Sequence, residues 1–568
     1  MSEPRIAPDS EAAYAKSAGR QLLIFGLLVV AAIVALMWVL QALAGMVGGS
    51  NANAQAINYA DQTITIALAE EPPQLDSTRA TDASSGMVLG HLMEGLLRMD
   101  LNDRLEPAIA ERWELTTTQA TFWLRKDAKW SDGRPITAHD FSFAWRTVLD
   151  PATASRYSFL LYPIKNGRAI NEGKLPPDQL GVSTPDDYTV VVELENPTPF
   201  FGKMVTFQTY FPLREDFYRS TNGKYGADAD KLLSSGPFVA TSWVHGASMY
   251  LEKNPHYWDR DRVKLNAINI GYITSDTNAT LNFFKDNKIA FTTLSAENLR
   301  EALEQRWHVK REQDGTVFYL EFNHQPNRLT RNKKLRQAMQ LVIDMDELVY
   351  KVTKLPGYLP GESLFPVWLM GVNDYFRKEY PAPELKLDQD RARQLLAEAK
   401  TELGLERWPE LVLLSGDNPL SSIQSEWVQG VLKEKLGLEL KIDKQIFKQR
   451  LEKMHAGDFD MVLGGWGPDY DDPLTFGDLF ASWNVQNRGG YASDELDRLV
   501  AIAQSSVDTE ERMRAFAGIQ QIIFDDVVIL PMYERGVTYV VHPDLHNVKR
   551  RVIGAAVDYT SAYIDRGS

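Results

Sequence analysis

Cysteine is absent from the 568-residue sequence. Its absence excludes disulfides, thiolate metal sites, a catalytic cysteine and a lipid-modified cysteine anchor, and it leaves the redox compartment open. The sequence also has no G-x-x-x-x-G-K-S/T phosphate loop, no G-x-S-x-G elbow and no H-E-x-x-H pair. The common motifs of ATPases, serine hydrolases and zinc proteases are therefore missing, which argues against an enzyme.

Basic residues are outnumbered by acidic ones, with 61 Lys and Arg against 76 Asp and Glu. The formal net charge is -15, the sequence pI is about 5.2, and no dense basic stripe occurs, so nucleic acid is not an expected partner. Hydrophobic residues make up 44% and charged residues 24%, which is typical of a folded protein. A chain of this length exceeds a single hydrophobic core and predicts at least two packed lobes.

One long apolar run extends from Leu22 to Val47. About 20 apolar residues are enough to cross a bilayer, so residues 21–47 predict a transmembrane helix or signal anchor. The basic residues before the run are Arg5, Lys16 and Arg20. The next one is Arg79, and the positive-inside rule therefore makes residues 1–20 a cytoplasmic tail.

A cleavable signal peptide is the competing interpretation, because the small residues from Ala52 to Ala56 offer Ala-x-Ala sites. Retention is favoured because the apolar run is longer than a signal core of roughly 7 to 15 residues. Residues 48–61 are small and polar and predict a flexible linker. We expect a single-pass inner-membrane protein with most of its chain in the periplasm, or a soluble periplasmic protein if cleavage occurs near Ala56.

Strand and helix patterns alternate beyond the linker, which predicts an α/β or α+β fold. The predicted strands are Thr63–Leu68, Thr121–Arg125, Tyr188–Leu194, Met249–Glu252 and Phe318–Phe322. The predicted helices are Leu89–Leu97, Thr137–Val148 with a capping box at Asp140, Lys334–Val349, Gln389–Leu403 and Ile423–Leu436. Strand Leu411–Leu414, the helix from Ile423 and strand Leu438–Ile442 predict a βαβ unit with parallel strands.

Several motifs together resemble the extracytoplasmic solute-binding proteins of family 5, which include the oligopeptide- and dipeptide-binding proteins of ABC transporters. The longest match runs from Phe122 to Arg146, FWLRKDAKWSDGRPITAHDFSFAWR. The other matching segments are Ala110–Trp113, Gly236–Phe238, Leu251–Trp258, Leu335–Met339 with Ile343 and Asp344, and Gly465–Pro473. Asp150–Tyr157 and Gly465–Pro473 are most similar to the oligopeptide-binding branch. The resemblance spans roughly residues 62 to 545.

This resemblance implies an α/β, two-lobed periplasmic binding protein fold of class II with an extra inserted subdomain, preceded by one transmembrane helix. The implied segments are 62–84 with 231–315 and 538–568 for lobe I, 85–230 for the inserted subdomain, and 316–537 for lobe II. The βαβ unit falls in lobe II. Hinge closure at the crossings near residues 315 and 537 is the expected motion.

The resemblance also implies a function. The chain is expected to be monomeric, to capture peptides between its lobes, and to deliver them to permease subunits in the inner membrane, with the ATPase on separate chains. We expect no cofactor and no metal. Relatives of this fold also carry nickel complexes, haem or sugars, and a peptide sensor would have the same bound state, so these alternatives stay open.

The candidate ligand-binding residues are Asp469, Trp466, Gly467, Glu71, Pro72, Pro73 and Arg488. The resemblance gives Asp469 the role of pairing with the peptide α-ammonium, with Trp466 and the backbone at Gly467 lining the same pocket. Glu71–Pro73 ends the first predicted strand and offers an edge for pairing with a peptide backbone. Arg488 is a candidate cation, and its alternative is an exposed surface arginine.

The acidic run that begins at Asp469 allows other interpretations. Asp471 and Asp472 can form a cluster at a helix N-terminus, which the helix dipole favours. A calcium loop fits less well, since its glycine and distal glutamate are missing, and Asp469 with Asp472 is the pair to test for acid–base chemistry. Met454 and Leu463 stand where the oligopeptide branch has basic side chains for the peptide carboxyl end, so ligand length stays open.

Overall fold

The computed structural model describes residues 55–102 and 104–566. The predicted cytoplasmic tail, the predicted membrane segment and the linker up to residue 54 lie outside these ranges. Within them, no helix combines the length and the apolar character that crossing a membrane requires.

The first sheet has five strands in the order β1-β2-β11-β10-β9. Their bounds are β1 Ile57–Asn58, β2 Thr63–Leu68, β11 Ala267–Ile273, β10 Ser248–Lys253 and β9 Phe238–Val244. β2 alternates as predicted and buries Ile64, Ile66 and Leu68, and it pairs in parallel with β11. Helix α2, Ala83–Leu92, packs against β9.

We call residues 85–230 the inserted segment. It contains a four-stranded antiparallel sheet in the order β5-β6-β8-β7, with bounds Ala110–Leu115, Gln119–Leu124, Thr189–Glu193 and Val182–Asp186. Helix α3, Ala138–Leu149, packs against β7 and β8. The predicted capping box at its start is confirmed, since the Asp140 carboxylate accepts the Thr137 backbone N–H at 2.8 Å.

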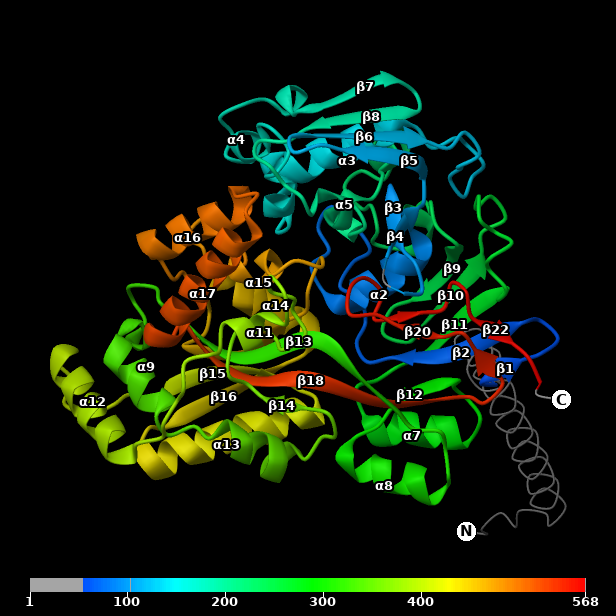
Figure 1. Ribbon diagram of the computed structural model, residues 1–568. Helices are drawn as coiled ribbons and strands as arrows, with labels where there is room; N and C mark the ends of the chain where they lie inside the picture. The colour runs from blue at the N-terminus through cyan, green and yellow to red at the C-terminus, as the bar shows by residue number, and fades with distance from the viewer. Residues whose placement is uncertain (1–54, 103, 567–568) are drawn as a thin grey trace, which may run out of the picture. The chain divides into compact units, whose positions relative to one another are not determined.

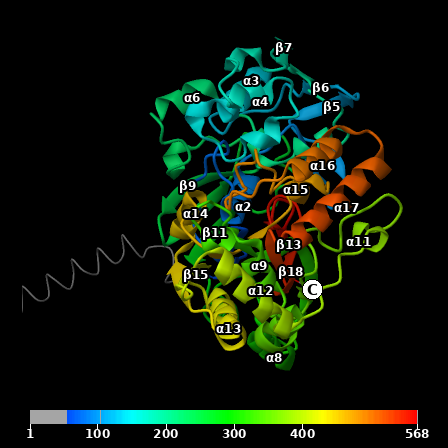
Figure 2. The same ribbon diagram turned by 90° about the vertical axis from the view of Figure 1, so that its left-hand side faces the viewer.

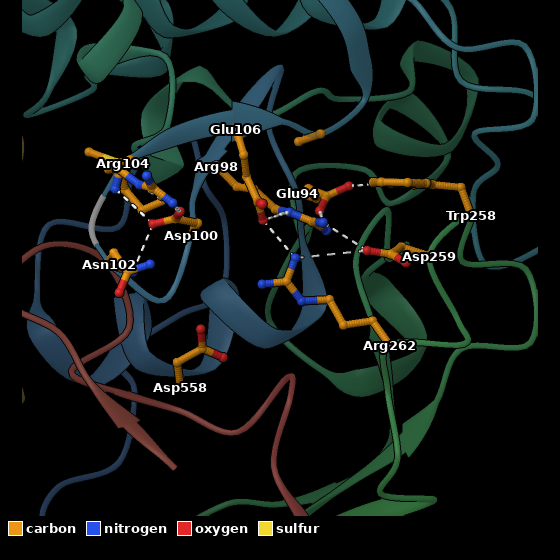
Figure 3. A network of polar contacts seen from close by, with 12 residues as sticks. Glu94, Arg98, Asp100, Asn102, Arg104, Glu106, Trp258, Asp259, Arg262 and Asp558 are labelled. Carbon is orange, nitrogen blue, oxygen red and sulfur yellow. Dashed lines mark hydrogen bonds and ion pairs between the residues drawn. The ribbon is translucent and has the colours of Figure 1, made fainter. Parts of the chain in front are cut away.

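A network of charged side chains binds the inserted segment to the chain that follows β10 (Figure 3). Arg98 lies in β3, Leu97–Met99, and its guanidinium donates to Glu106 at 2.7 Å in β4, Leu105–Pro107. The same guanidinium donates to Glu94 at 3.0 Å and to Asp259 at 2.7 Å. Charge-assisted hydrogen bonds are about twice as strong as neutral ones, so we expect the inserted segment and the first sheet to move as one body.

The largest sheet has seven strands, with the order β12-β18-β13-β17-β15-β16 and β14 beside β18. Their bounds are β12 Phe291–Thr293, β13 Lys310–Phe322, β14 Leu359–Pro360, β15 Leu411–Gly416, β16 Leu440–Gln445, β17 Met461–Trp466 and β18 Ile529–Val541. β15 and β16 are parallel and joined by α13, Pro419–Leu436, which confirms the predicted βαβ unit. Figure 1 shows α13 along one face of this sheet.

The predicted crossings near residues 315 and 537 fall inside β13 and β18, not in loops. These two 13-residue strands pair with each other, and their register shifts between Gln313 and Val317. Gly315 lies in this bulge with φ +78°, a left-handed conformation that glycine adopts without strain. The domain boundaries themselves stay predictions.

The remaining elements connect or cover these sheets (Figures 1 and 2). The α-helices are α4 Gly167–Asn171, α5 Phe201–Met204, α6 Glu215–Ser220, α7 Thr277–Lys285, α8 Ala296–Glu304, α11 Phe376–Glu379, α12 Gln389–Glu402, α14 Phe447–Ala456, α15 Leu474–Gly477, α16 Asp494–Ser505 and α17 Thr509–Asp525. Short strand pairs close the chain: β19 Leu545–His546 with β22 Tyr563–Ile564, and β20 Lys549–Arg550 with β21 Val557–Asp558.

Three predicted helices have the wrong bounds. The helix predicted from Ile423 is α13, which starts at Pro419 because the Asn418 side chain accepts the Ser421 N–H at 2.9 Å. The predicted helix Leu89–Leu97 is α2, which starts at Ala83 because the Asp82 carboxylate accepts the Ser85 N–H at 2.8 Å, and which ends at Leu92. The predicted helix Lys334–Val349 is divided into α9 Lys333–Gln340, α10 Met345–Glu347 and the π-helical turn Leu348–Thr353. Asp344 caps the second piece through the Glu347 N–H, which favours a new start over a continuous helix.

Candidate functional site

Asp469 lies in the loop between β17 and α15, and only 5% of its surface is exposed. Its Oδ1 accepts the hydroxyl of Tyr157 at 2.9 Å, and its backbone N–H donates to Thr475 Oγ1 at 2.9 Å. Oδ2 is buried and accepts no hydrogen bond from the described residues. One oxygen of the carboxylate is therefore available to a further donor.

The electrostatics of Asp469 fit a positively charged donor. Burial raises the pKa of its carboxyl to about 8, although the hydrogen bond from Tyr157 acts in the opposite direction. A buried carboxylate returns to its charged form when an opposite charge comes within hydrogen-bonding distance. The geometry thus provides one acceptor for a buried cation, and Tyr157 holds the other oxygen in place.

Trp466 ends β17, and Gly467 follows it in the loop that leads to Asp469. The Trp466 ring meets the Tyr157 ring edge-on, with centroids 6.1 Å apart at 87°. Its Nε1 is buried and has no partner within the described chain. A Cβ added at Gly467 would lie 3.4 Å from Thr316 Oγ1, so the backbone is open to close approach there.

Tyr157 itself was missed as a site residue, although it closes one of the motifs that carry the resemblance. It precedes the 3-10 turn Ser158–Leu161 in the inserted segment and is 4% exposed. Burial and the neighbouring Asp469 raise its pKa well above the usual value, so its hydroxyl stays protonated and donates.

Arg488 is half-buried, and the interpretation as an exposed surface arginine is wrong. Its Nη2 donates to Gln486 Oε1 at 2.9 Å, and Gln486 Nε2 donates to the backbone oxygen of Arg156 at 3.1 Å. Glu321 in β13 is fully buried, and burial raises the pKa of its carboxyl to about 7 while the charge of Arg488 lowers it. Arg488 therefore belongs to an interior polar group.

Helix α14 adds two basic side chains that the sequence did not reveal as site residues. Arg450 donates from Nη1 to the backbone oxygen of Leu463 at 3.1 Å, and burial lowers its pKa. Burial, together with the positive charges of Arg488 and Arg156, lowers the pKa of His455 to about 3. Among the described residues, none of these side chains has a carboxylate within 4 Å. Arg450 lies one helical turn before Met454 in α14, and this spacing could have identified it as a basic side chain near the predicted carboxyl-end position.

Glu71 is not brought to Asp469. Its carboxylate accepts the Trp243 Nε1–H at 3.1 Å and the Gly246 N–H at 2.9 Å, and it contacts His245 Nδ1 at 2.8 Å. Pro72 is buried and Pro73 is half-buried. No hydrogen bond links the backbone of residues 69–73 to the rest of the described chain, so this predicted edge has unused backbone groups.

The other aspartates of the acidic run have partners of their own. Asp472 receives two hydrogen bonds from Arg512, at 2.7 and 3.0 Å, and its Oδ1 also accepts the Leu474 N–H at 3.0 Å. Asp471 pairs with Lys203 of α5 at 2.5 Å. Only the Leu474 N–H bond to Asp472 fits the helix N-terminal interpretation. The main partners of Asp472 and Asp471 are Arg512 and Lys203, which are far away in the sequence.

Residues 104–488 match the family model described as bacterial extracellular solute-binding proteins, family 5 Middle. The chain belongs to this family, which makes it a solute-binding protein and not an enzyme. The oligopeptide-binding protein OppA of Bacillus subtilis is 30% identical over 88% of this chain and 92% of its own length. These findings confirm the resemblance drawn from the motifs.

Solved structures confirm the α/β periplasmic binding protein fold. The substrate-binding domain of an oligopeptide ABC transporter from Bacillus anthracis superposes with a TM-score of 0.85 at 32% identity, over 90% of this chain and 100% of that one. OppA of Listeria monocytogenes bound to peptide gives a TM-score of 0.84 at 31% identity, over 89% of this chain and 99% of that one.

Proposed function

We propose that this protein is the peptide-binding component of an ABC importer, held at the outer face of the inner membrane by residues 21–47. The observation that carries the proposal is the buried Asp469 carboxylate, with Oδ1 bound to Tyr157 and Oδ2 without a partner among residues 55–102 and 104–566. Oligopeptide-binding proteins are among its relatives at about 30% identity over most of the chain.

Asp469 is the receptor for the α-ammonium of the peptide. A charge-assisted hydrogen bond contributes about 1.5–3 kcal/mol, compared with about 1 kcal/mol for a neutral one. Trp466 and the backbone at Gly467 line the same pocket, and Trp466 Nε1 can donate to a peptide carbonyl.

The peptide backbone and its far end use other groups. Residues 69–73 offer backbone C=O groups, and residues 69–71 also N–H groups, that have no partner in the described part of the chain, which suits strand addition without regard to side chains. Arg488 and Arg450 supply positive charge to the carboxyl end or to acidic side chains, because Met454 and Leu463 cannot.

Closure brings the two halves of the ammonium pocket together. Tyr157 belongs to the inserted segment and Asp469 follows β17, and two further contacts join the same parts: Lys203 with Asp471, and Gln486 with Arg156. A ligand that contacts both parts stabilises the closed arrangement in proportion to its preference for that arrangement. β13 and β18 provide the hinge.

The membrane helix sets where this takes place. Without cysteine a cysteine-linked lipid anchor is impossible, and a retained helix with a short linker gives an effective concentration of order mM near a membrane partner. That partner is a permease whose ATPase is on separate chains.

Calorimetry on the full-length chain tests the proposal with one peptide in two forms, with a free amino end and N-acetylated. The free peptide is expected to bind at least tenfold more tightly, and Asp469→Asn is expected to abolish this preference. Asp471→Asn, two residues away and paired with Lys203, is the matched control and is expected to retain it. Equal binding of both forms by the parent chain, or copurification of a nickel complex or sugar in place of peptides, would refute the proposal.

A further inference from the structure

A cavity of about 490 Å³ lies between the inserted segment and the region that follows β17. One side is formed by residues from Phe159 to Met204, and the other by residues from Tyr470 to Gln504. None of the seven predicted ligand-binding residues is part of its lining. The volume falls within the range of about 300–1,000 Å³ that is usual for small-molecule sites.

Aromatic rings form much of the wall. Phe200 and Tyr470 stack almost in parallel, with centroids 5.7 Å apart and an interplanar angle of 4°. Across the same boundary, the Trp483 ring lies 5.9 Å from the Tyr162 ring. Phe159 completes the aromatic lining. Arg168 lies over the Trp483 ring and Arg512 over the Phe200 ring, 5.4 and 4.9 Å from the ring centroids. The rings therefore serve a ligand mainly as an apolar packing surface.

The lining of the cavity contains more acidic than basic side chains. Its two cations, Arg168 and Lys174, both pair with Glu172, at 2.9 and 2.5 Å. Glu195 and Asp478 are also in the lining, and neither has a basic side chain within 4 Å in the described part of the chain. The cavity therefore has two carboxylates without a matching cation.

Asp478 is the more informative of the two, because it is only 3% exposed. Its Oδ1 accepts a long hydrogen bond from Asn484 Nδ2 at 3.4 Å, which is the only hydrogen bond from another side chain to this carboxylate in the described part of the chain. Burial, with Asp469 and then Asp472 nearby, raises the pKa of the Asp478 carboxyl well above its usual range. A positive charge beside it would reverse that effect.

We propose that this cavity is a second binding site, which takes a small organic ammonium ion whose charged end pairs with Asp478 and whose apolar body lies among Phe200, Tyr470 and Trp483. Both sides of the boundary contribute to the lining, so the site is complete only while they are in contact. A bound amine therefore favours the closed arrangement and slows release of the ligand at Asp469, a consequence that rests on the proposed function.

Calorimetry with phenethylammonium and with its neutral counterpart 2-phenylethanol tests the site. The full-length Asp469→Asn variant is used as the background, because it lacks the ammonium receptor proposed above. We expect phenethylammonium to bind at least tenfold more tightly than the alcohol. Asp478→Asn in this background is expected to remove the preference, and Glu195→Gln to weaken it a few-fold. Glu193 ends β8 and is not part of the cavity lining, so Glu193→Gln is the control and is expected to retain the preference for the amine.

Equal binding of the two probes, no binding of the amine, or an unchanged preference in Asp478→Asn would overturn the second site. If Asp478→Asn fails to fold, as judged by circular dichroism, an unchanged preference in Glu195→Gln has the same meaning. In the parent chain, phenethylammonium is expected to slow dissociation of a labelled peptide. If the peptide itself does not bind, the proposed function fails while the calorimetry on the second site still stands.

Discussion

The apparent affinity for a peptide with a free amino end is expected to rise steeply with pH. Only the charged carboxylate of Asp469 pairs with an ammonium group, and burial raises the pKa of this carboxyl to about 8. At pH 6 about 1% of the carboxyl is ionised, which corresponds to a penalty of about 2.7 kcal/mol, or about 100-fold in affinity. The affinity is expected to increase about tenfold per pH unit from pH 6 and to level off near pH 8. There the peptide α-amine, with a pKa of about 7.7–8.0, also begins to lose its proton.

Proton release is the direct assay for this effect. A carboxyl that binds a proton in the free protein and loses it to an ammonium ligand releases about one proton per peptide at pH 6–7. Calorimetry in two buffers of different ionisation enthalpy measures this number. Glu321, whose pKa burial raises to about 7, titrates in the same window. Glu321→Gln is therefore the control, and it is expected to keep most of the release.

Two variants at the site make the reasoning refutable. Asp469→Asn is expected to flatten the pH profile and to abolish the release. Tyr157→Phe removes the hydrogen bond that lowers the Asp469 pKa, so its profile is expected to shift to higher pH. A flat profile without proton release in the parent chain would show that Asp469 is already charged before the ligand arrives, and the electrostatic reasoning would fail.

Further predictions concern charge and stability. Arg488→Gln is expected to weaken a peptide with a free carboxyl end about tenfold and its amide little, as measured by calorimetry; equal losses would exclude carboxyl recognition. Lys203→Ala removes a half-exposed pair with Asp471, so peptide release is expected to accelerate up to a few-fold at low salt and hardly at high salt in stopped-flow measurements. Arg512→Met leaves Asp472 buried without its cation and is expected to lower the free energy of unfolding in urea by about 3–5 kcal/mol; a loss below 1 kcal/mol would contradict this.

The fold could be predicted where short-range signals decide it. The capping box at Thr137 and the βαβ unit around α13 depend on residues close in sequence, and both are confirmed. The end of α2 depends on distant contacts, because the Leu92 backbone oxygen accepts the Gly236 N–H at 3.0 Å and the Glu94 N–H donates to Ser235 Oγ at 2.9 Å. No local pattern contains that information.

The site divides in the same way. Asp469 could be found because a nine-residue motif surrounds it, whereas its hydrogen-bond partner Tyr157 is 312 positions away. The burial of Arg488 depends on Gln486, which bonds to a backbone oxygen 330 positions distant. The solvent exposure of a single arginine depends on tertiary contacts, so it cannot be predicted from the residues around it in the sequence.

The division of the ammonium pocket between two parts of the chain has a consequence for the order of events. Under the proposed hinge closure, the carboxylate of Asp469 and the hydroxyl of Tyr157 meet only in the closed arrangement, so the proposed ammonium pocket is complete only then. In the open arrangement the protein can bind an extended peptide backbone weakly. The amino end of the peptide reaches the complete pocket at Asp469 only in the last step. A segment from the middle of a longer chain, which has no free amino end, would be captured and then released before the lobes lock. The proposed mechanism therefore separates peptides from unfolded proteins by how long each stays bound, and not by how fast each binds.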